Sequence, residues 1–322
     1  MTTDPNRRKL LKSLALAPAA GIAANPSVAA DTPAGTQRPG VFNTLHPLVP
    51  QGLTVLAGRP NNGKSSLAMN IALEHAARTH QHAWYIGAQP GGVEAPACLI
   101  PVDCSAHLNI IDRPKAEQER NACRRLTIET ADSAGTVHVI DPPGRLYSWL
   151  DAADELHNLL NASRSPEVDA PGLIVLDEYD IAFQGMVWGH DSLPYITAEL
   201  ARFSSETGIT VVMLARLTPF ADLPAERQRH PDARPRPSDF SELGRTMDHV
   251  TMALALYRPE LYISDDYDEE EREILGTYLD RDANRNVLEL GLAKSPYGDA
   301  GNWCMSFRLS YDPHTRRYRA EA

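Results

Sequence analysis

A short apolar segment, followed by a glycine-containing loop and an amphipathic helix, constrains this chain most. Residues 53–57 (LTVLA) have the composition of a buried strand, and residues 58–65 carry the pattern G-x-x-x-x-G-K-S. Apolar residues then recur at helical spacing to about Arg78. A chance glycine-rich turn rarely has both flanks, whereas a loop that wraps a phosphate requires them. The segment therefore predicts a nucleotide-binding site in an α/β fold.

The chemistry of phosphate binding gives each part of this loop a role. Successive backbone N–H groups and the positive end of the following helix attract the anion. Lys64 is expected to reach the β- and γ-phosphates, and the Ser65 hydroxyl to ligate Mg²⁺. The expected cofactors are thus ATP and Mg²⁺. The expected nucleotide-binding residues are Gly58, Arg59, Pro60, Asn61, Asn62, Gly63, Lys64, Ser65 and Ser66.

A second apolar run ends in a carboxylate. Residues 173–176 (LIVL) resemble a buried strand, and Asp177 follows them directly. At the carboxyl edge of a parallel sheet, beside a phosphate loop, such an aspartate holds Mg²⁺ through water. Ser65 and Asp177 are therefore the expected metal-binding pair.

Further apolar runs alternate with helical patterns along the chain. The clearest helix covers residues 192–207 and stops at Gly208. This alternation predicts an α/β fold with a mostly parallel central sheet, helices on both faces, and ligands at the carboxyl ends of its strands. The later strands lie close together in sequence and are expected to form an antiparallel edge. The other strand candidates are 83–88, 137–140, 209–215, 250–257, 287–293 and 305–310.

Taken together, these segments resemble the RecA-type P-loop ATPase domain of DnaB-like replicative helicases. Five blocks carry the resemblance in order: GRPNNGKSSLAMNIALEHA, LIVLDEYDIA, ITAELARFSSETGITVVMLARL, RPRPSDFSELG and ALALYRPELY. The resemblance runs from about Leu53 to Tyr318. It implies ATP hydrolysis coupled to 5′-to-3′ unwinding in DNA replication. It also implies a ring, usually a hexamer, with ATP between subunits and single-stranded DNA in the central channel.

The chain departs from this family where nucleotide is hydrolysed. Gln89 occupies the place of the glutamate that activates water, and loss of a general base costs about 10²–10⁴ in rate. Pro296 replaces the arginine finger, a loss of about 10³–10⁵, although the nearby Lys294 is kept. Arg216 stands in place of a sensor glutamine, and Ser241 in place of the arginine of D-L-R-E-S-G. Hydrolysis is therefore expected to be slow or rewired.

Two charged residues offer substitutes for the missing groups. Glu178 directly follows Asp177 and is a candidate general base, while Arg216 is a candidate source of positive charge from within the subunit. The alternative for each is a solvated charge at the sheet edge. The catalytic candidates are Lys64, Gln89, Glu178, Arg216 and Lys294.

An arginine-containing segment, residues 218–238, follows the strand that ends near Arg216. Loops in this region face the channel in the resembling family. A basic loop on a chain of net charge −11 suits salt-sensitive binding to the backbone of single strands. Phe220 is its one candidate for base stacking, and a solvated surface loop is the alternative interpretation. The candidate nucleic-acid contacts are Arg227, Arg229, Arg234 and Arg236.

Two further features carry no catalytic chemistry. The acidic run 265–273 supplies over half of the net charge and is expected to be a solvated loop. Cys98, Cys104, His107 and Cys123 do not have a standard zinc spacing, so the cysteines are expected to act as small hydrophobic residues.

The first residues differ in character from the rest. Residues 7–30 place Arg7 and Arg8 before a weakly apolar stretch that ends in small residues, and they resemble a twin-arginine export signal. The alternative is a basic tail, because Pro18 and Pro26 interrupt any long helix. Residues 31–39 have the composition of a linker.

The expected organisation is a leader and linker over residues 1–39 and one ATPase domain over residues 40–322. The leader region is too short for the helical N-terminal domain of DnaB-like helicases. No run after the leader has the length of a membrane span. A cytoplasmic location is favoured, with export as the alternative. The functional alternatives are a helicase-like ATPase on single-stranded DNA and a non-unwinding nucleotide-binding regulator, such as a plasmid or phage accessory protein.

Overall fold

The structure of the chain is a computed structural model. It describes residues 49–87, 98–111, 123–129, 135–141, 171–177, 189–217, 223, 234–236, 239, 247–263, 282, 284–294 and 306–320. The predicted leader and linker over residues 1–39 and the acidic run 265–273 lie outside these described residues.

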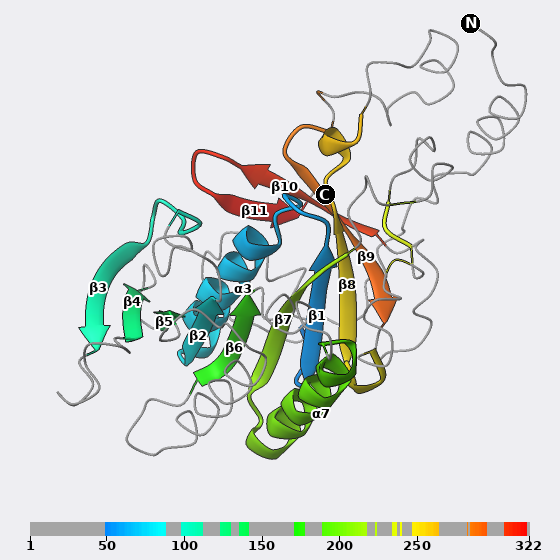
Figure 1. The fold of residues 1–322 in the computed structure, drawn as a ribbon. Helices are drawn as coiled ribbons and strands as arrows, with labels where there is room; N and C mark the ends of the chain where they lie inside the picture. Colours follow the sequence, from blue (N-terminus) through cyan, green and yellow to red (C-terminus); the bar gives the residue numbers. More distant parts are fainter. Residues whose placement is uncertain are drawn as a thin grey trace, which may run out of the picture.

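An eleven-stranded sheet organises the described part of the chain (Figure 1). Its centre is parallel, since each pairing from β8 across to β5 runs in the same direction. This confirms the mostly parallel α/β sheet predicted from the sequence. In spatial order these strands are β8 (Met252–Tyr257), β1 (Leu53–Gly58), β7 (Thr210–Arg216), β6 (Pro171–Asp177), β2 (His82–Gly87) and β5 (Thr136–Asp141).

Antiparallel strands extend the sheet at both sides. Beyond β8 lie β9 (Val287–Lys294), β10 (Ser306–Asp312) and β11 (Arg317–Ala320), each antiparallel to its neighbour. This arrangement confirms the antiparallel edge expected for the later strands. Beyond β5 lie β4 (Cys123–Glu129) and β3 (Ser105–Ile111), also antiparallel. The sequence patterns did not predict β3, β4 or β11.

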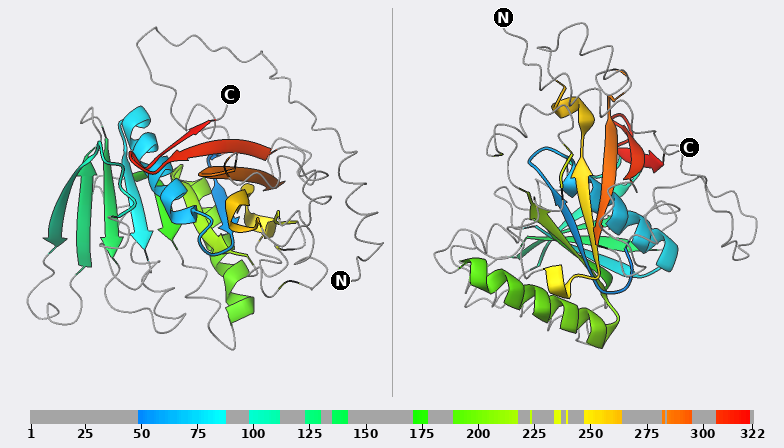
Figure 2. Two further views of the ribbon diagram at one scale, coloured as in Figure 1. Left: turned by 90° about the horizontal axis from the view of Figure 1, so that it is seen from above. Right: turned by 90° about the vertical axis from the view of Figure 1, so that its right-hand side faces the viewer.

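Two helices cover opposite faces of the parallel centre (Figure 2). Helix α3 (Lys64–Thr79) packs on one face, where Leu67 joins the cluster that contains Leu56 of β1. Helix α7 (Gly189–Thr207) packs on the other, where Phe203 joins the cluster that contains Val55. Alternate residues of each strand thus pack into the clusters on opposite faces of the sheet, because side chains alternate along a strand with a period of two.

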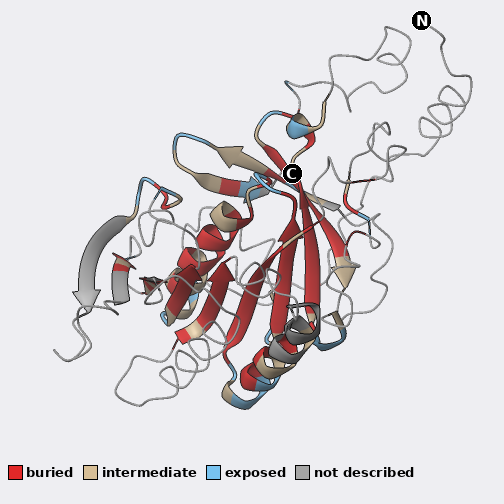
Figure 3. Cartoon of the chain, viewed as in Figure 1, coloured by how far each residue is buried: buried red, intermediate tan, exposed pale blue. Residues whose placement is uncertain are grey.

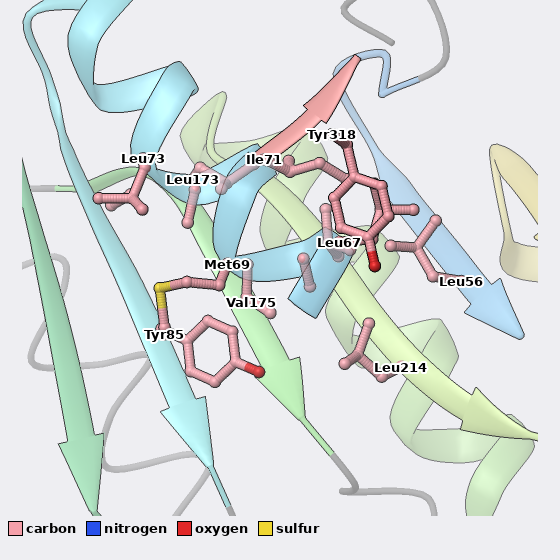
Figure 4. Packing of buried hydrophobic residues seen from close by; sticks show 14 of the residues in the cluster. Leu56, Leu67, Met69, Ile71, Leu73, Tyr85, Leu173, Val175, Leu214 and Tyr318 are labelled. Atoms are coloured by element: carbon pink, nitrogen blue, oxygen red, sulfur yellow. The ribbon is translucent and has the colours of Figure 1, made fainter. Parts of the chain in front are cut away.

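Burial follows this layering closely. The residues of β1 and β8 are all buried, and Figure 3 shows the buried residues gathered on the parallel strands. In Figure 4, Met69 of α3 lies beside Tyr85 and Val175 of the sheet, and Ile71 lies beside Tyr318. Near-continuous apolar strands are expected where both faces of a parallel sheet are covered.

The helix ends follow local sequence signals. Helix α3 begins at Lys64, directly after the loop, and ends before His80, whose N–H bonds the Ala76 carbonyl. Helix α7 begins at Gly189, before the predicted start at residue 192, and Gly208 ends it with φ 76°. Among the described residues, no helix is long and apolar enough to cross a membrane.

Candidate nucleotide-binding site

The sheet register gathers the predicted functional positions at one edge. Gly58, the last residue of β1, pairs with Arg216 at the end of β7 and with Leu256 near the end of β8. At the end of β2, Gly87 pairs with Asp177. The carboxyl ends of parallel strands are where open α/β sheets bind ligands. The phosphate loop, Asp177 and Arg216 therefore share this edge.

The loop that connects β1 to α3 has the backbone conformation of a phosphate cradle. Asn61 and Gly63 have positive φ angles of 65° and 84°, which turn the chain sharply before the helix. A Cβ at Gly63 would lie 2.8 Å from the Tyr318 hydroxyl oxygen. Both the angle and the close approach therefore require glycine at position 63.

The Lys64 ammonium lies inside this loop. Its side chain is buried, with residue exposure of 8%, and Nζ donates to the carbonyl oxygens of Gly58 at 3.0 Å and Arg59 at 3.3 Å. An ammonium has three donors on a flexible stem, so it can exchange carbonyl partners for phosphate oxygens. The location of Lys64 is therefore suited to the role that the sequence predicts.

A tyrosine connects the two expected magnesium-binding residues. The Tyr85 hydroxyl donates to Asp177 Oδ2 at 2.5 Å and lies 3.5 Å from the carbonyl oxygen of Ser65. Asp177 is 1% exposed. The Ser65 hydroxyl and the Asp177 carboxylate are oxygen ligands of the kind that Mg²⁺ binds. The residues present thus fit a magnesium ion beside the loop.

Asn62 fixes the phosphate loop to the segment that follows β8. Its side-chain Nδ2 donates to the Tyr262 hydroxyl at 2.9 Å and to the Arg59 and Pro60 carbonyls, both at 3.2 Å. Its Oδ1 accepts from the Arg258 backbone N–H at 2.8 Å. Buried amides are stable only when hydrogen-bonded, so this network fixes the loop shape before any ligand binds.

The side chain of Arg59 makes a buried ion pair. Its Nη2 lies 3.1 Å from Asp239 Oδ2, and the two side chains are 2% and 4% exposed. Its guanidinium also lies over the Tyr262 ring, with 5.7 Å from Cζ to the ring centroid. The predicted contribution of Arg59 to nucleotide binding was through its backbone, and the structure shows that its side chain is engaged with Asp239 and Tyr262.

Arg234 and Arg236, two of the predicted nucleic-acid contacts, differ in environment. Arg234 forms a two-pronged ion pair with Glu289 of β9, at 2.7 and 3.1 Å, and lies over the Tyr257 ring. Arg236 is exposed. Arg234 thus anchors the segment, whereas Arg236 is accessible to a partner. Arg227 and Arg229 lie outside the described residues.

Lys294 is distant from the phosphate loop of its own chain. It ends β9 and pairs with Ala253, at the beginning of β8, so it lies toward the opposite edge of the parallel sheet. Its Nζ donates to the Met247 carbonyl at 2.6 Å. A role for Lys294 in nucleotide chemistry therefore requires the site of another copy.

Three of the departures from the family pattern, Gln89, Ser241 and Pro296, lie outside the described residues, as does Glu178, the candidate substitute base. Gly87, two residues before Gln89, pairs with Asp177, which directly precedes Glu178. Arg216 is partly exposed, next to the first residue of the loop.

A pocket of about 130 Å³ opens beside the loop on the α3 face. Tyr318 lines this pocket, and burial raises the pKa of its phenol to about 12. Arg258 contributes a cation and Tyr311 a second ring. The lining residues are Gly63, Ser66, Leu99, Arg258, Asn286, Val287, Leu288, Tyr311 and Tyr318.

Sequence reasoning did not identify several residues of this site. Tyr85 appeared only as part of an apolar strand, although a tyrosine with a buried hydroxyl needs a polar partner. Asp239 lies within the block RPRPSDFSELG without a predicted role, and its position as an acid close to arginines was the available signal. Asn62 was assigned to the loop backbone alone. Their partners are distant in sequence, so spacing does not reveal them.

Comparison with known proteins identifies the fold. No protein-family model matches the chain. Among solved structures, the ATPase domain of G40P aligns with a TM-score of 0.53 at 16% identity, covering 84% of this chain and 85% of that one. A DnaB-like replicative helicase, solved in a study of its interactions with primase, aligns with a TM-score of 0.55 at 16% identity, covering 89% and 64%. The chain therefore has the α/β, RecA-like fold of helicase ATPase domains.

Sequence comparison places the similarity more narrowly. The replicative DNA helicase DnaC of Bacillus subtilis (strain 168) is 23% identical over 264 residues, which are 81% of this chain and 51% of that protein. The replicative DNA helicase DnaB of Geobacillus stearothermophilus is 22% identical over the same shares. The chain spans about half the length of these curated relatives. It is thus similar in sequence to replicative DNA helicases and has the fold of their ATPase domains.

Proposed function

We propose that the chain binds ATP with Mg²⁺ at the edge formed by the phosphate loop and Asp177. The observation that carries this proposal is the Tyr85 hydroxyl, which bonds Asp177 and lies beside the Ser65 backbone below the loop. When bound, the Mg²⁺ nucleotide supplies a phosphoanhydride whose charge the metal partly neutralises. Lys64 and the backbone N–H groups of residues 58–65 hold the phosphates, while Ser65 and Asp177 hold the metal.

The pocket beside Gly63 supports the same proposal. It adjoins the loop and combines an apolar wall with the Arg258 side chain and the Tyr311 ring. Small-molecule sites have this mixture of apolar surface and a few polar groups. We assign the pocket to the nucleoside end of the ligand.

Hydrolysis is proposed to be slow. Gln89 can orient a water molecule but cannot accept its proton, and Pro296 cannot stabilise developing charge as an arginine finger does. Glu178 is the proposed substitute base and Arg216 the proposed substitute cation. The pairing of Arg216 with Gly58 at the end of β7 supports this role, because the phosphate loop begins at Gly58.

Action on single-stranded DNA, within a cytoplasmic ring, completes the proposal. The chain resembles replicative helicases, and the exposed Arg236 follows a segment that also contains Arg227 and Arg229. The location of Lys294 away from its own loop supports a role at the site of a neighbouring copy. A hexamer is the proposed assembly.

Three measurements on one preparation test this function. Titration of a fluorescent ATP analogue should show Mg²⁺-dependent binding that Lys64→Ala abolishes. Sizing with and without ATP and single-stranded DNA should show a ring. ATP turnover should be slow and should rise in Gln89→Glu, because that variant restores a general base. Turnover typical of a ring helicase in the natural chain would contradict the slow-hydrolysis proposal.

The second candidate function is a nucleotide-binding regulator that does not unwind DNA. The departures at Gln89, Pro296 and Ser241 favour it, because they leave the binding residues intact and change those for hydrolysis and transmission. Its expected result is ATP binding with turnover unchanged by Gln89→Glu and no strand displacement from a forked duplex.

A further inference from the structure

We propose that His82 and His138 form a binding site for a divalent transition-metal ion of the Zn²⁺ class. The two ring nitrogens that face each other, His82 Nδ1 and His138 Nε2, lie 3.1 Å apart. The site joins β2 to β5 and does not depend on the proposed function. His82 begins β2, whereas Gly87 ends it beside Asp177, so about 16 Å of strand separates this pair from the nucleotide edge.

The sheet holds both imidazole rings on one face. His138 pairs in register with Trp84, which lies two residues after His82 on β2, so all three side chains point to the same side. Trp84 is buried in the cluster on the α7 face. On the opposite face, the neighbouring Ala83 and Val137 are fully buried in the other core cluster. Packed strands thus fix the separation of the rings, as a preformed ligand site requires.

The separation of the two nitrogens matches that of imidazole ligands on one ion. Zinc–nitrogen bonds are about 2.0–2.1 Å long, and ligands of this class of ion subtend angles from about 90° to about 109°. Two such bonds place their nitrogens about 2.8–3.4 Å apart, a range that includes the distance between His82 and His138. A hydrogen bond between two neutral rings has the same length, with one ring donating and the other accepting. The experiment below distinguishes a shared ion from a shared proton.

The donor set selects the class of ion. Imidazole nitrogen suits Zn²⁺, Cu²⁺ and Ni²⁺, whereas Mg²⁺ and Ca²⁺ take oxygen ligands. Within the described ranges, no group of three or more His, Cys, Asp or Glu side chains is placed to hold an ion, so water completes the coordination of an ion held by this pair. His82 and His138 are both half-buried, which leaves the ion a path from solvent. A bound ion would tie β5 to β2.

Calorimetric titration of the full chain with Zn²⁺, after dialysis against EDTA and then metal-free buffer, counts the sites and gives their affinities. His82→Gln and His138→Gln are the principal variants. Glutamine can still hydrogen-bond to the remaining imidazole, but its amide is a poor ligand for this class of ion. Each variant should therefore lose one site, or bind at it more than about tenfold more weakly, since loss of a supporting partner alone costs that much. The double variant should lose no second site.

His314→Gln is the matched control, because it removes an exposed imidazole from the turn between β10 and β11. It should keep the site. Urea unfolding provides a second measurement that needs no variant. In the natural chain, Zn²⁺ should raise the midpoint and Mg²⁺ should not, because an ion that binds the folded state stabilises it by mass action. If one glutamine variant does not fold, the other decides, since either substitution removes a ligand.

Several results would overturn the proposal. One is the same number of Zn²⁺ sites, with the same affinities, in the natural chain and in the two glutamine variants. Another is an equal loss in His314→Gln. A natural chain that neither binds Zn²⁺ nor gains stability from it would show that His82 and His138 share only a proton. Binding of the ATP analogue should be unchanged in all three single variants, so failure of the proposed nucleotide function would leave this result standing.

Discussion

Replacing Tyr85 with phenylalanine tests the connection between the magnesium-binding residues most directly. The change removes one oxygen and leaves the ring in its buried place on β2. What is lost is a 2.5 Å donor to Asp177, a carboxylate that is 1% exposed. A hydrogen bond to a charged group contributes about 1.5–3 kcal/mol to stability. The upper part of this range applies here, because the buried Asp177 carboxylate would lose this donor.

Two quantities should therefore change together. Unfolding in urea should show a loss of about 2–3 kcal/mol for Tyr85→Phe with no change in the m-value. Affinity for an ATP analogue in Mg²⁺ should fall by about 10–100-fold, the usual effect of removing a partner that orients a metal ligand. Affinity in EDTA should stay within about threefold of the natural chain, because the loop N–H groups and Lys64 are untouched.

The EDTA titration separates this mechanism from general damage. An equal loss of affinity with and without Mg²⁺ would mean that Tyr85 supports the fold alone. Full stability together with full affinity would refute the reasoning, because it would show that Asp177 does not depend on the Tyr85 hydroxyl.

Three further predictions concern neighbouring features. Gly63→Ala should destabilise the chain by about 1–3 kcal/mol in urea unfolding and abolish binding of the ATP analogue, since φ is 84° and the new Cβ meets the Tyr318 hydroxyl. Burial raises the pKa of Tyr318 from 10.0 to about 12, so the folded state keeps this proton longer than the unfolded state. Stability present below pH 10 should thus be lost between about pH 10 and 12, by about 2–3 kcal/mol, and Tyr318→Phe should lack this loss. Arg234→Ala should cost about 2 kcal/mol, because the buried Glu289 loses its two-pronged partner and keeps the longer contact with Arg308 Nε at 3.8 Å. Arg236→Ala should stay within about 0.5 kcal/mol but weaken binding of oligo(dT).

The central elements of the fold follow from local sequence because their causes are local. The apolar run before Gly58 has no polar residue to expose except Thr54, so it is suited to a strand covered on both faces. Helix α3 ends within one residue of the predicted Arg78 because its apolar spacing stops there. Leu200 and Phe203 are buried against the sheet as the pattern of residues 192–207 requires.

The strands that escaped prediction have causes elsewhere in the chain. The β3 and β4 sequences, SAHLNII and CRRLTIE, mix polar and apolar residues without a clear period, and their pairing with each other and with β5 gives them their conformation. In the short β11 two arginines, Arg317 and Arg319, flank Tyr318, whose burial against α3 and β10 was not visible in its composition.

Sequence motifs located the site, but its contacts depend on distant residues. The loop pattern put Lys64 and Ser65 directly after the β1 strand, and the apolar run before Asp177 put that carboxylate at the end of β6. The partners of Arg59 and Arg234 were hidden, because Asp239 and Glu289 are brought to them only by the folded sheet. An arginine in a basic segment thus suggested a nucleic-acid contact, whereas Arg234 is used to anchor the segment.

The position of β1 between β7 and β8 also determines when this chain can fold during its synthesis. Val55 pairs with Met213 on one side and with Ala253 on the other, so the central strand is made long before either partner. At about 5–20 residues per second, a ribosome takes on the order of ten seconds or more to complete β7. During that interval β1 has neither of its neighbouring strands, although β2, β5 and β6, on which α3 packs, are already made. The apolar segment Leu53–Gly58 should therefore remain an unpaired, aggregation-prone strand of the nascent chain until β7 and then β8 are made.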